Sequence, residues 1–505
     1  MKVLGKTESV CPICFQEKKI NKIDAQLFEE KGKIWMLKRC PTHGSFEEMY
    51  FGDEDVYNRW MTHKETGHPV PEIKTSLFND PPLYEVHVSQ PVLTNLMITN
   101  RCNVRGADSS LNAWHAGYIY EPSIRQLNEL IQQAKGGTPP GSYAIQITGG
   151  EPTLRNDLFE ILSNAKKIGF SHVQIQTNGI TLAEDVEYCQ RLKDAGIDTI
   201  YMSFDGVTLE TNPLISYHKK ALENLRNVNL NVVLVPVLIG GKNVHESGKI
   251  VRFALDNINV VRGVHFLPLT FCGQITNTNN DERQRQRVDF IQMITGIEQE
   301  FAGMISRDDF YPIPIMDPLL QLLEMTTKEP QVRFTAHPCC GGSTFLYMKD
   351  GKPLPIARFL NVETILQFIN DHKKKKGPML RLRLLYAFTK SIDSFVEKEK
   401  TPHGFDLKQI ARETATIGSQ YAMREFYHKT LFVGSMWYQD VWNLDIDQLQ
   451  RCVVHYTTPE GIVPYCSYHG LGYGEKILKK YSISVKEWEE KTGRRLEDDL
   501  SKEVS

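Results

Sequence analysis

Short apolar runs alternate with helix-like segments between about residues 92 and 275, and this alternation restricts the folds open to the chain. Strands separated by helices of about 10–15 residues build βαβ units, which lie in a parallel sheet. Six successive units fit an open or partial (βα) TIM-type barrel better than a closed eightfold barrel, which needs about 250 residues. We therefore predict an α/β fold with a partial six-unit barrel.

The same pattern gives the expected elements of this barrel. The predicted strands are Leu93–Thr99, Ala144–Thr148, Val173–Thr177, Thr199–Phe204, Val232–Ile239 and Gly263–Leu269. The predicted helices lie near Ser123–Lys135, Asp157–Ile168, Ala183–Ala195, His218–Arg226 and Val244–Asn257. Pro122 and Ser123 suit the start of the first helix.

A length of 505 residues predicts about three domains. Residues 1–70 are expected to form a small metal-binding domain with a strand at Lys33–Lys38, and residues 71–91 a proline-containing linker. Residues 92–275 form the barrel in this division. Residues 276–505 form a mainly helical, cysteine-bearing C-terminal region.

Charge and hydropathy exclude two classes of protein. The chain has 59 Lys and Arg against 61 Asp and Glu, a formal net charge of -2, so we predict no nucleic-acid partner. It has no run of about 18 apolar residues and no apolar N-terminal segment, which predicts a cytoplasmic protein. In that setting its 10 cysteines are better explained as metal ligands or free thiols than as disulfides.

The strongest metal signal is N-terminal, where Cys11 and Cys14 precede Cys40 and His43. Two such chelating pairs can close a tetrahedral site of three sulfurs and one nitrogen, rubredoxin-like or zinc-ribbon-like, around mononuclear Zn or Fe. Four protein ligands leave no open position, so we expect a structural role. The alternative is four unligated side chains.

Polar turns follow three consecutive predicted strands. Because parallel α/β folds bind ligands at the carboxyl ends of their strands, three such turns predict a small-molecule site. Taken singly, a Gly-Gly turn is more often structural. The residues of these turns are Gly149, Gly150, Glu151 and Pro152, then Thr177 and Asn178, then Ser203 and Asp205.

These turns resemble the radical S-adenosylmethionine (SAM) superfamily. Gly149–Pro152 is similar to the family turn that holds the amino group of the methionine part of SAM. Thr99–Ser109 occupies the place of the family's Cys-x3-Cys-x2-Cys, whose thiolates bind a [4Fe-4S] cluster. Here Cys102 is present, but Gly106 and Ser109 replace the other two cysteines. Without remote cysteines, reductive cleavage of SAM is expected to fail, and Cys102 would be an inert thiol.

A closer resemblance covers nearly the whole chain. The sequence is similar to archaeal radical SAM enzymes that include tetraether lipid synthase and pterin-methylating members. This resemblance implies radical C–C bond formation or methylation on an archaeal lipid or a pterin-like substrate. The similar stretches are Cys11–Gly44, Ala116–Pro122, Ile147–Pro152, Tyr201–Val207, Gly263–Pro268, Cys340–Phe345 and Arg451–Cys466.

The resemblance also assigns roles to late cysteines. Cys340, Cys452 and Cys466, with Cys339 as a further candidate, would hold an auxiliary [4Fe-4S] cluster; the alternative is free cysteines in a small core. A second auxiliary motif of the family aligns with Phe78, Pro82 and Glu85, where this chain has no cysteine.

Two function classes remain open on the sequence. The first is an enzyme that acts on a lipid or pterin-like substrate with an electron donor. The second is a non-catalytic paralogue that keeps the fold and binds SAM, lipid or an active homologue. Lys373–Phe388 would suit peripheral contact with an anionic membrane, or a lysine run before a core helix. Leu431–Tyr438 would line a lipid channel or form a core helix.

Overall fold

The computed structural model describes residues 2–75, 77–105, 111–273, 275, 278–327, 330–373, 375, 379–403, 405–409 and 428–500. The N-terminal part is a four-stranded antiparallel sheet of β1 (Lys2–Val10), β2 (Lys22–Glu30), β3 (Lys33–Cys40) and β4 (Gly44–Phe51). A one-turn helix, α1 (Pro12–Gln16), follows β1, and α2 (Glu54–Met61) follows β4. The predicted strand at Lys33–Lys38 is confirmed as β3.

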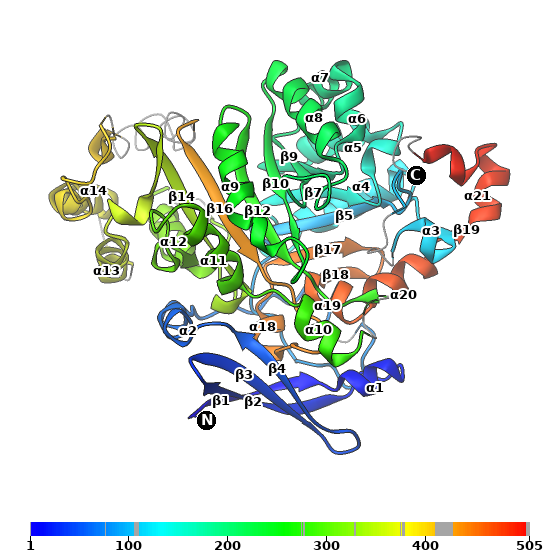
Figure 1. The fold of residues 1–505 in the computed structure, drawn as a ribbon, viewed down its shortest axis with the longest axis horizontal. Helices are drawn as coiled ribbons and strands as arrows, with labels where there is room; N and C mark the ends of the chain where they lie inside the picture. Colours follow the sequence, from blue (N-terminus) through cyan, green and yellow to red (C-terminus); the bar gives the residue numbers. More distant parts are fainter. Residues whose placement is uncertain are drawn as a thin grey trace.

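The barrel sheet contains all six predicted strand segments as direct neighbours (Figure 1). They are β5 (Leu93–Thr99), β7 (Ala144–Gly149), β8 (His172–Thr177), β9 (Thr199–Ser203), β10 (Asn231–Val235) and β12 (Val261–Pro268). Each pairs in parallel with the next. The segment Val232–Ile239 is interrupted at Pro236, which has no N–H for the ladder, and resumes as β11 (Val237–Leu238).

The C-terminal region extends this sheet at both edges. A parallel strand, β16 (Thr430–Met436), adds to β12, and another, β17 (Val454–Thr458), adds to β5. The expectation that Leu431–Tyr438 forms a helix is therefore wrong, because this segment pairs on both sides with strands from distant parts of the chain. Antiparallel strands complete the two edges: β13 (Tyr311–Pro312), β14 (Gly341–Lys349), β15 (Lys352–Pro355) and β18 (Gly461–Pro464).

Helices cover the outer face of the barrel strands (Figure 1). Ser123 caps α4 through a reciprocal capping box with Gln126, as its position before the predicted helix suggests. The predicted helix Ala183–Ala195 is divided at Asp185, which caps its second half. The helices of this layer are α4 (Ile124–Lys135), α5 (Leu158–Ile168), α6 (Ile180–Glu184), α7 (Val186–Asp194), α8 (Ile215–Asn227) and α9 (Ser247–Asp256).

The remaining helices surround the barrel edges and the C-terminal strands. They are α3 (Ala113–Ala116), α10 (Asn280–Gln286), α11 (Phe290–Glu300), α12 (Met316–Thr327), α13 (Val362–His372), α14 (Leu380–Ser391), α18 (Ile446–Gln450), α19 (Tyr465–Gly470), α20 (Tyr473–Lys480) and α21 (Val485–Thr492). A short pair of β6 (Tyr118–Ile119) and β19 (Ile483–Ser484) attaches the chain end to the barrel. Among the described residues, no helix combines the length and the apolar character needed to cross a membrane.

A buried ion-pair network joins the N-terminal sheet to the C-terminal region. Arg287 lies between the carboxylates of Glu48 (2.6 Å) and Asp440 (3.1 Å), and the side chains of all three are buried. Arg283 also pairs with Glu48 (3.2 Å). Buried charges of this kind are stable only when their partners are present.

We predict that Arg287→Met lowers the free energy of unfolding by about 3–5 kcal/mol, because it leaves two buried carboxylates without their guanidinium. Urea denaturation followed by circular dichroism measures this change. Arg285→Met, at a solvent-exposed arginine two residues earlier, should leave the midpoint unchanged. Equal urea midpoints for the two variants would show that the ion-pair network does not stabilise the fold.

Candidate functional site

The turn after β7 packs directly against the exit of β5. The backbone N–H of Gly150 donates to the carbonyl of Thr99 at 2.8 Å. A Cβ on Gly149 would lie 2.3 Å from that oxygen, and a Cβ on Gly150 would lie 2.2 Å from the carbonyl of Arg101. Both positions need glycine because the two backbones approach so closely. The turn therefore lies beside the loop that begins at Cys102.

Glu151 links this turn to the turn after β8. Its carboxylate accepts hydrogen bonds from the Thr177 hydroxyl (2.8 Å) and the Asn178 backbone N–H (2.8 Å). It also accepts two from Thr153, through the backbone N–H and the hydroxyl. Burial raises the pKa of Glu151, while these donors favour the carboxylate. Pro152 begins a single 3₁₀ turn after it.

Asn178 and Asp205 connect the exits of β8 and β9 to neighbouring segments. The Asn178 side chain donates to Asn103, at the start of the cysteine loop, at 2.7 Å. Asp205 accepts from the backbone N–H of Val237 at 2.8 Å and so connects the exit of β9 to β11. Ser203 is the last residue of β9. All the turn residues predicted from the sequence thus lie at one end of one sheet.

The loop after β5 does not have the donors of a three-thiolate cluster. Cys102 is half-buried, and burial raises the pKa of its thiol to about 12, so it is protonated at neutral pH. Gly106 and Ser109 lie outside the described residues, and neither residue type supplies a thiolate. Iron–sulfur clusters are held by cysteine thiolates. The residues present here do not fit a [4Fe-4S] cluster.

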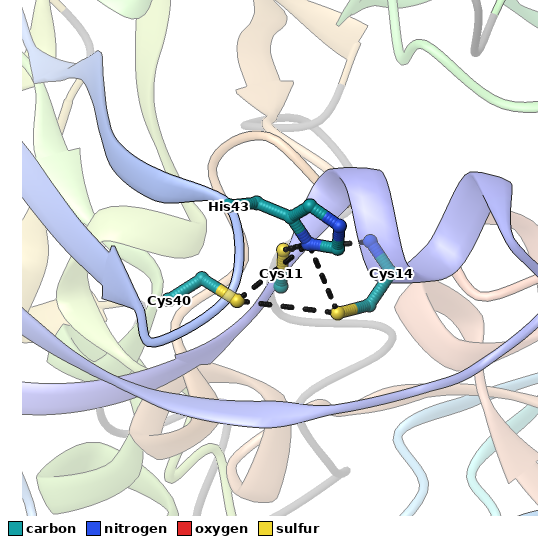
Figure 2. Close-up of side chains that lie close together, drawn as sticks. All are labelled: Cys11, Cys14, Cys40 and His43. Atoms are coloured by element: carbon teal, nitrogen blue, oxygen red, sulfur yellow. Dashed lines mark hydrogen bonds between the residues drawn. The ribbon is translucent and has the colours of Figure 1, made fainter.

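Figure 2 shows the four N-terminal residues converging on one point. The Nδ1 atom of His43 lies 3.5 Å from the sulfur of Cys11, 3.4 Å from that of Cys14 and 3.7 Å from that of Cys40. The Cys14 and Cys40 sulfurs are 4.0 Å apart. A zinc tetrahedron with ordinary Zn–S and Zn–N bonds has edges of about 3.5–3.8 Å. The donor set therefore fits mononuclear Zn or Fe.

Local structure prepares this site for a metal. Helix α1 begins at Pro12, and the backbone N–H of Cys14 donates to the Cys11 sulfur at 3.4 Å. Burial opposes ionisation of Cys40, but hydrogen bonds from the backbone of His43 and Thr42 outweigh it and lower the pKa of Cys40 to about 6. Glu17 lies 3.4 Å from His43 Nε2 and orients the ring with Nδ1 toward the sulfurs.

Three late cysteines also lie together. Cys466 lowers the pKa of the Cys452 thiol by hydrogen bonding, and Cys452 raises the pKa of Cys466 in return. Burial raises the pKa of Cys340, and a negative charge on Cys452 adds to that shift. All three are buried, and their charges add to the rise that burial gives the pKa of Tyr438. The fold thus brings together cysteines that are more than 100 residues apart along the chain, between Cys340 and Cys452.

A cavity of about 330 Å³ lies inside the barrel. Its polar side is formed by side chains of the parallel strands, and the rest of the lining is mainly apolar. The polar residues are Asn95, Gln146, Gln176, Tyr201 and His265; the apolar ones include Phe345, Phe432, Met436, Tyr438 and Tyr465. A volume of this size is typical of a site for a small organic ligand.

The polar side of the cavity was not predicted from the sequence. The available signal was the segment Val173–Thr177, where Gln174 and Gln176 alternate with apolar residues although both faces of a parallel strand are usually apolar. Val173 and Ile175 pack into the core, while Gln176 lines the cavity.

Comparison with known proteins decides the family. The chain is 34% identical over 500 residues to the 7,8-dihydro-6-hydroxymethylpterin dimethyltransferase of Methanocaldococcus jannaschii, and the match covers 96% of each chain. The family model "Radical SAM superfamily" matches residues 102–254. The chain belongs to the radical SAM superfamily. The matched residues of this radical SAM protein run from Cys102 into α9.

Further matches cover shorter stretches of the chain. A second family model, the "HMPTM N-terminal zinc ribbon domain", matches residues 3–52, so the N-terminal sheet is a metal-binding ribbon. A probable GTP 3',8-cyclase of Methanothermobacter thermautotrophicus is 32% identical over 234 residues, covering 43% of this chain and 68% of the relative. SuiB of Streptococcus suis bound to SAM is 15% identical, with a TM-score of 0.30, covering 36% of this chain and 41% of SuiB.

We predict that Cys40→Ala releases the ribbon metal, because three ligands with one open position bind it less tightly. Metal content after dialysis, measured by mass spectrometry, should fall from about one equivalent of Zn or Fe to less than about 0.2 per chain. Cys189→Ala removes a buried thiol from α7 and is the matched control. Unchanged metal content in Cys40→Ala would contradict the ligand assignment.

Proposed function

We propose that this radical SAM protein binds SAM at its strand-end turns and a pterin-like heterocycle in the barrel cavity. The relationship to a pterin dimethyltransferase over 96% of both chains supports this choice. The observation that carries it is the cavity, whose polar side offers hydrogen bonds to a small polar ring.

In this proposal some strand-end residues contact SAM, and one positions the turns. Gly149 and Gly150 present half-buried backbone groups, which suit the amino group of SAM. Asn178, Ser203 and Asp205 surround the same edge and would contact the rest of SAM. Glu151 is a positioning residue, because its carboxylate is already filled by hydrogen bonds from the protein.

We further propose that this chain does not reductively cleave SAM by itself. The loop after β5 supplies one cysteine, Cys102, where a cluster of the family needs three thiolates. This favours the non-catalytic paralogue, which would bind SAM and a small molecule or pair with an active homologue. Peripheral contact with a membrane remains a prediction; among the described residues of α14, Leu382 and Tyr386 are exposed.

The second candidate is radical methylation of a pterin, or C–C bond formation on an archaeal lipid, with an external electron donor. The three clustered thiols favour it, since Cys340, Cys452 and Cys466 have the chemistry to hold an auxiliary iron–sulfur cluster. Such a cluster would supply electron transfer or hold an intermediate when bound.

We predict that the wild-type protein, reconstituted anaerobically with iron and sulfide, yields no 5′-deoxyadenosine from SAM under dithionite. Liquid chromatography with mass spectrometry measures this product. Gly106→Cys with Ser109→Cys should add about four irons per chain and a SAM-sensitive paramagnetic signal, because it restores three thiolates. Ser171→Cys with Ser394→Cys adds two exposed thiols elsewhere and should add no such signal. Steady 5′-deoxyadenosine formation by the wild type would refute the non-catalytic proposal in favour of the second candidate.

Gly150→Ala should weaken SAM binding at least about tenfold, because the new Cβ would overlap the carbonyl of Arg101 and push the turn away from β5. Isothermal titration calorimetry measures the affinity. Gly5→Ala, at a strand position with open space around the added carbon, is the control. If Gly150→Ala binds SAM like the wild type, the turn is not the SAM site.

A further inference from the structure

We propose that Gln176, Tyr201 and His265 are specificity-determining residues that recognise the polar edge of a flat, uncharged heterocycle. This inference rests on the proposed function and assigns the recognition to named side chains. All three line the cavity, and they come from three different strands, β8, β9 and β12. No hydrophobic pattern in the sequence requires polar residues at these positions.

A ladder of amides fixes which end of Gln176 faces a ligand. Gln174 donates to the Gln146 carbonyl oxygen at 2.6 Å, and Gln146 donates to Asn95 at 2.8 Å and to Gln176 Oε1 at 3.1 Å. Asn95 in turn donates to the backbone carbonyl of His455 at 3.1 Å. Because the oxygen of Gln176 is occupied, its side chain offers the Nε2 donor to the cavity.

Tyr201 lies directly beside Gln176 in the parallel register of β8 and β9. Burial raises the pKa of its hydroxyl to about 12, so it keeps its proton at neutral pH. Tyr201 therefore adds a second donor next to that of Gln176.

His265 supplies both a donor and an acceptor. Burial lowers its pKa to about 4, so the imidazole is neutral at physiological pH and carries one N–H and one bare nitrogen. Within the described residues neither ring nitrogen has a hydrogen-bond partner, and its ring lies parallel to that of Phe432 with centroids 6.5 Å apart. Its neighbour across the ladder in β16 is Gly434, which contributes no side chain to compete for the imidazole.

The apolar part of the cavity lining suits the faces of a ring. Phe345 and Phe432 meet edge to face at 5.4 Å, and Met436 lies on the same strand as Phe432. A ring carrying carbonyl and N–H groups on one edge, such as a 2-amino-4-oxopteridine, would satisfy the polar side and pack against these residues. An alkyl chain would leave the donors of the polar side unpaired, which opposes its binding.

Fluorescence titration with 7,8-dihydro-6-hydroxymethylpterin tests this assignment. Gln176→Leu and His265→Phe should each weaken binding at least about tenfold, since each loses hydrogen bonds in a buried site. His265→Gln, which keeps a donor and an acceptor, should recover most of the affinity. Between pH 5.5 and 8 the wild-type affinity should stay constant, because a His265 with a pKa of about 4 does not titrate there.

The controls are His172→Phe and Gln133→Leu, at half-buried residues that do not line the cavity. Ribbon metal content and melting temperature confirm that each variant is folded. Failure of the wild type to bind the pterin would refute the proposed function. If the wild type binds the pterin tightly and all the variants retain that affinity, only the recognition by these residues is refuted. Palmitate that displaces the pterin with equal affinity would also refute this recognition.

Discussion

One buried carboxylate, that of Glu151, holds the strand-end site together. Hydrogen bonds to it come from the turn that contains it and from the turn after β8. An ionised group in such surroundings is stable only if nearly all of its acceptor positions are used, so the two turns cannot move independently. The close backbone contact of Gly149 and Gly150 with β5 adds the third element.

This arrangement separates the scaffold of the site from the iron chemistry of the family. Among the described residues, the hydrogen bonds that organise the turns come from Thr153, Thr177 and Asn178, and none involves the side chain of Cys102. A chain of this fold can therefore lose cluster ligands and retain both its strand-end turns and its cavity. Membership of the superfamily thus describes the barrel, whereas activity depends on the ligands in the loop after β5.

The six barrel strands were predictable because each is a short apolar run followed by a helix, which is a local signal. The strands β16 and β17 were not, since their parallel partners lie far away in the sequence and a segment such as Leu431–Tyr438 has no alternation of its own. The same physical reason explains why the C-terminal region, predicted to be mainly helical, also contributes to the barrel sheet.

The site residues likewise differ in whether local sequence or the tertiary fold determines their positions. The four ribbon ligands were predictable because each chelating pair is encoded by a spacing of three residues. The turns could be located because they follow strands directly. Gln176, Tyr201 and His265 come together only after three strands have aligned in register, and their inward orientation depends on which face the helices cover. The convergence of Cys340, Cys452 and Cys466 likewise depends on the tertiary fold.

The two outer parallel strands also determine when the barrel can form during synthesis. Both β16 and β17 belong to the last 80 or so residues, whereas their partners, β12 and β5, are made much earlier. A growing chain therefore exposes two unpaired strand edges until β16 and β17 have been made, and such edges readily pair with other chains. The barrel sheet is thus completed by late strands, and any species that lacks them keeps two edges open to pairing with other chains.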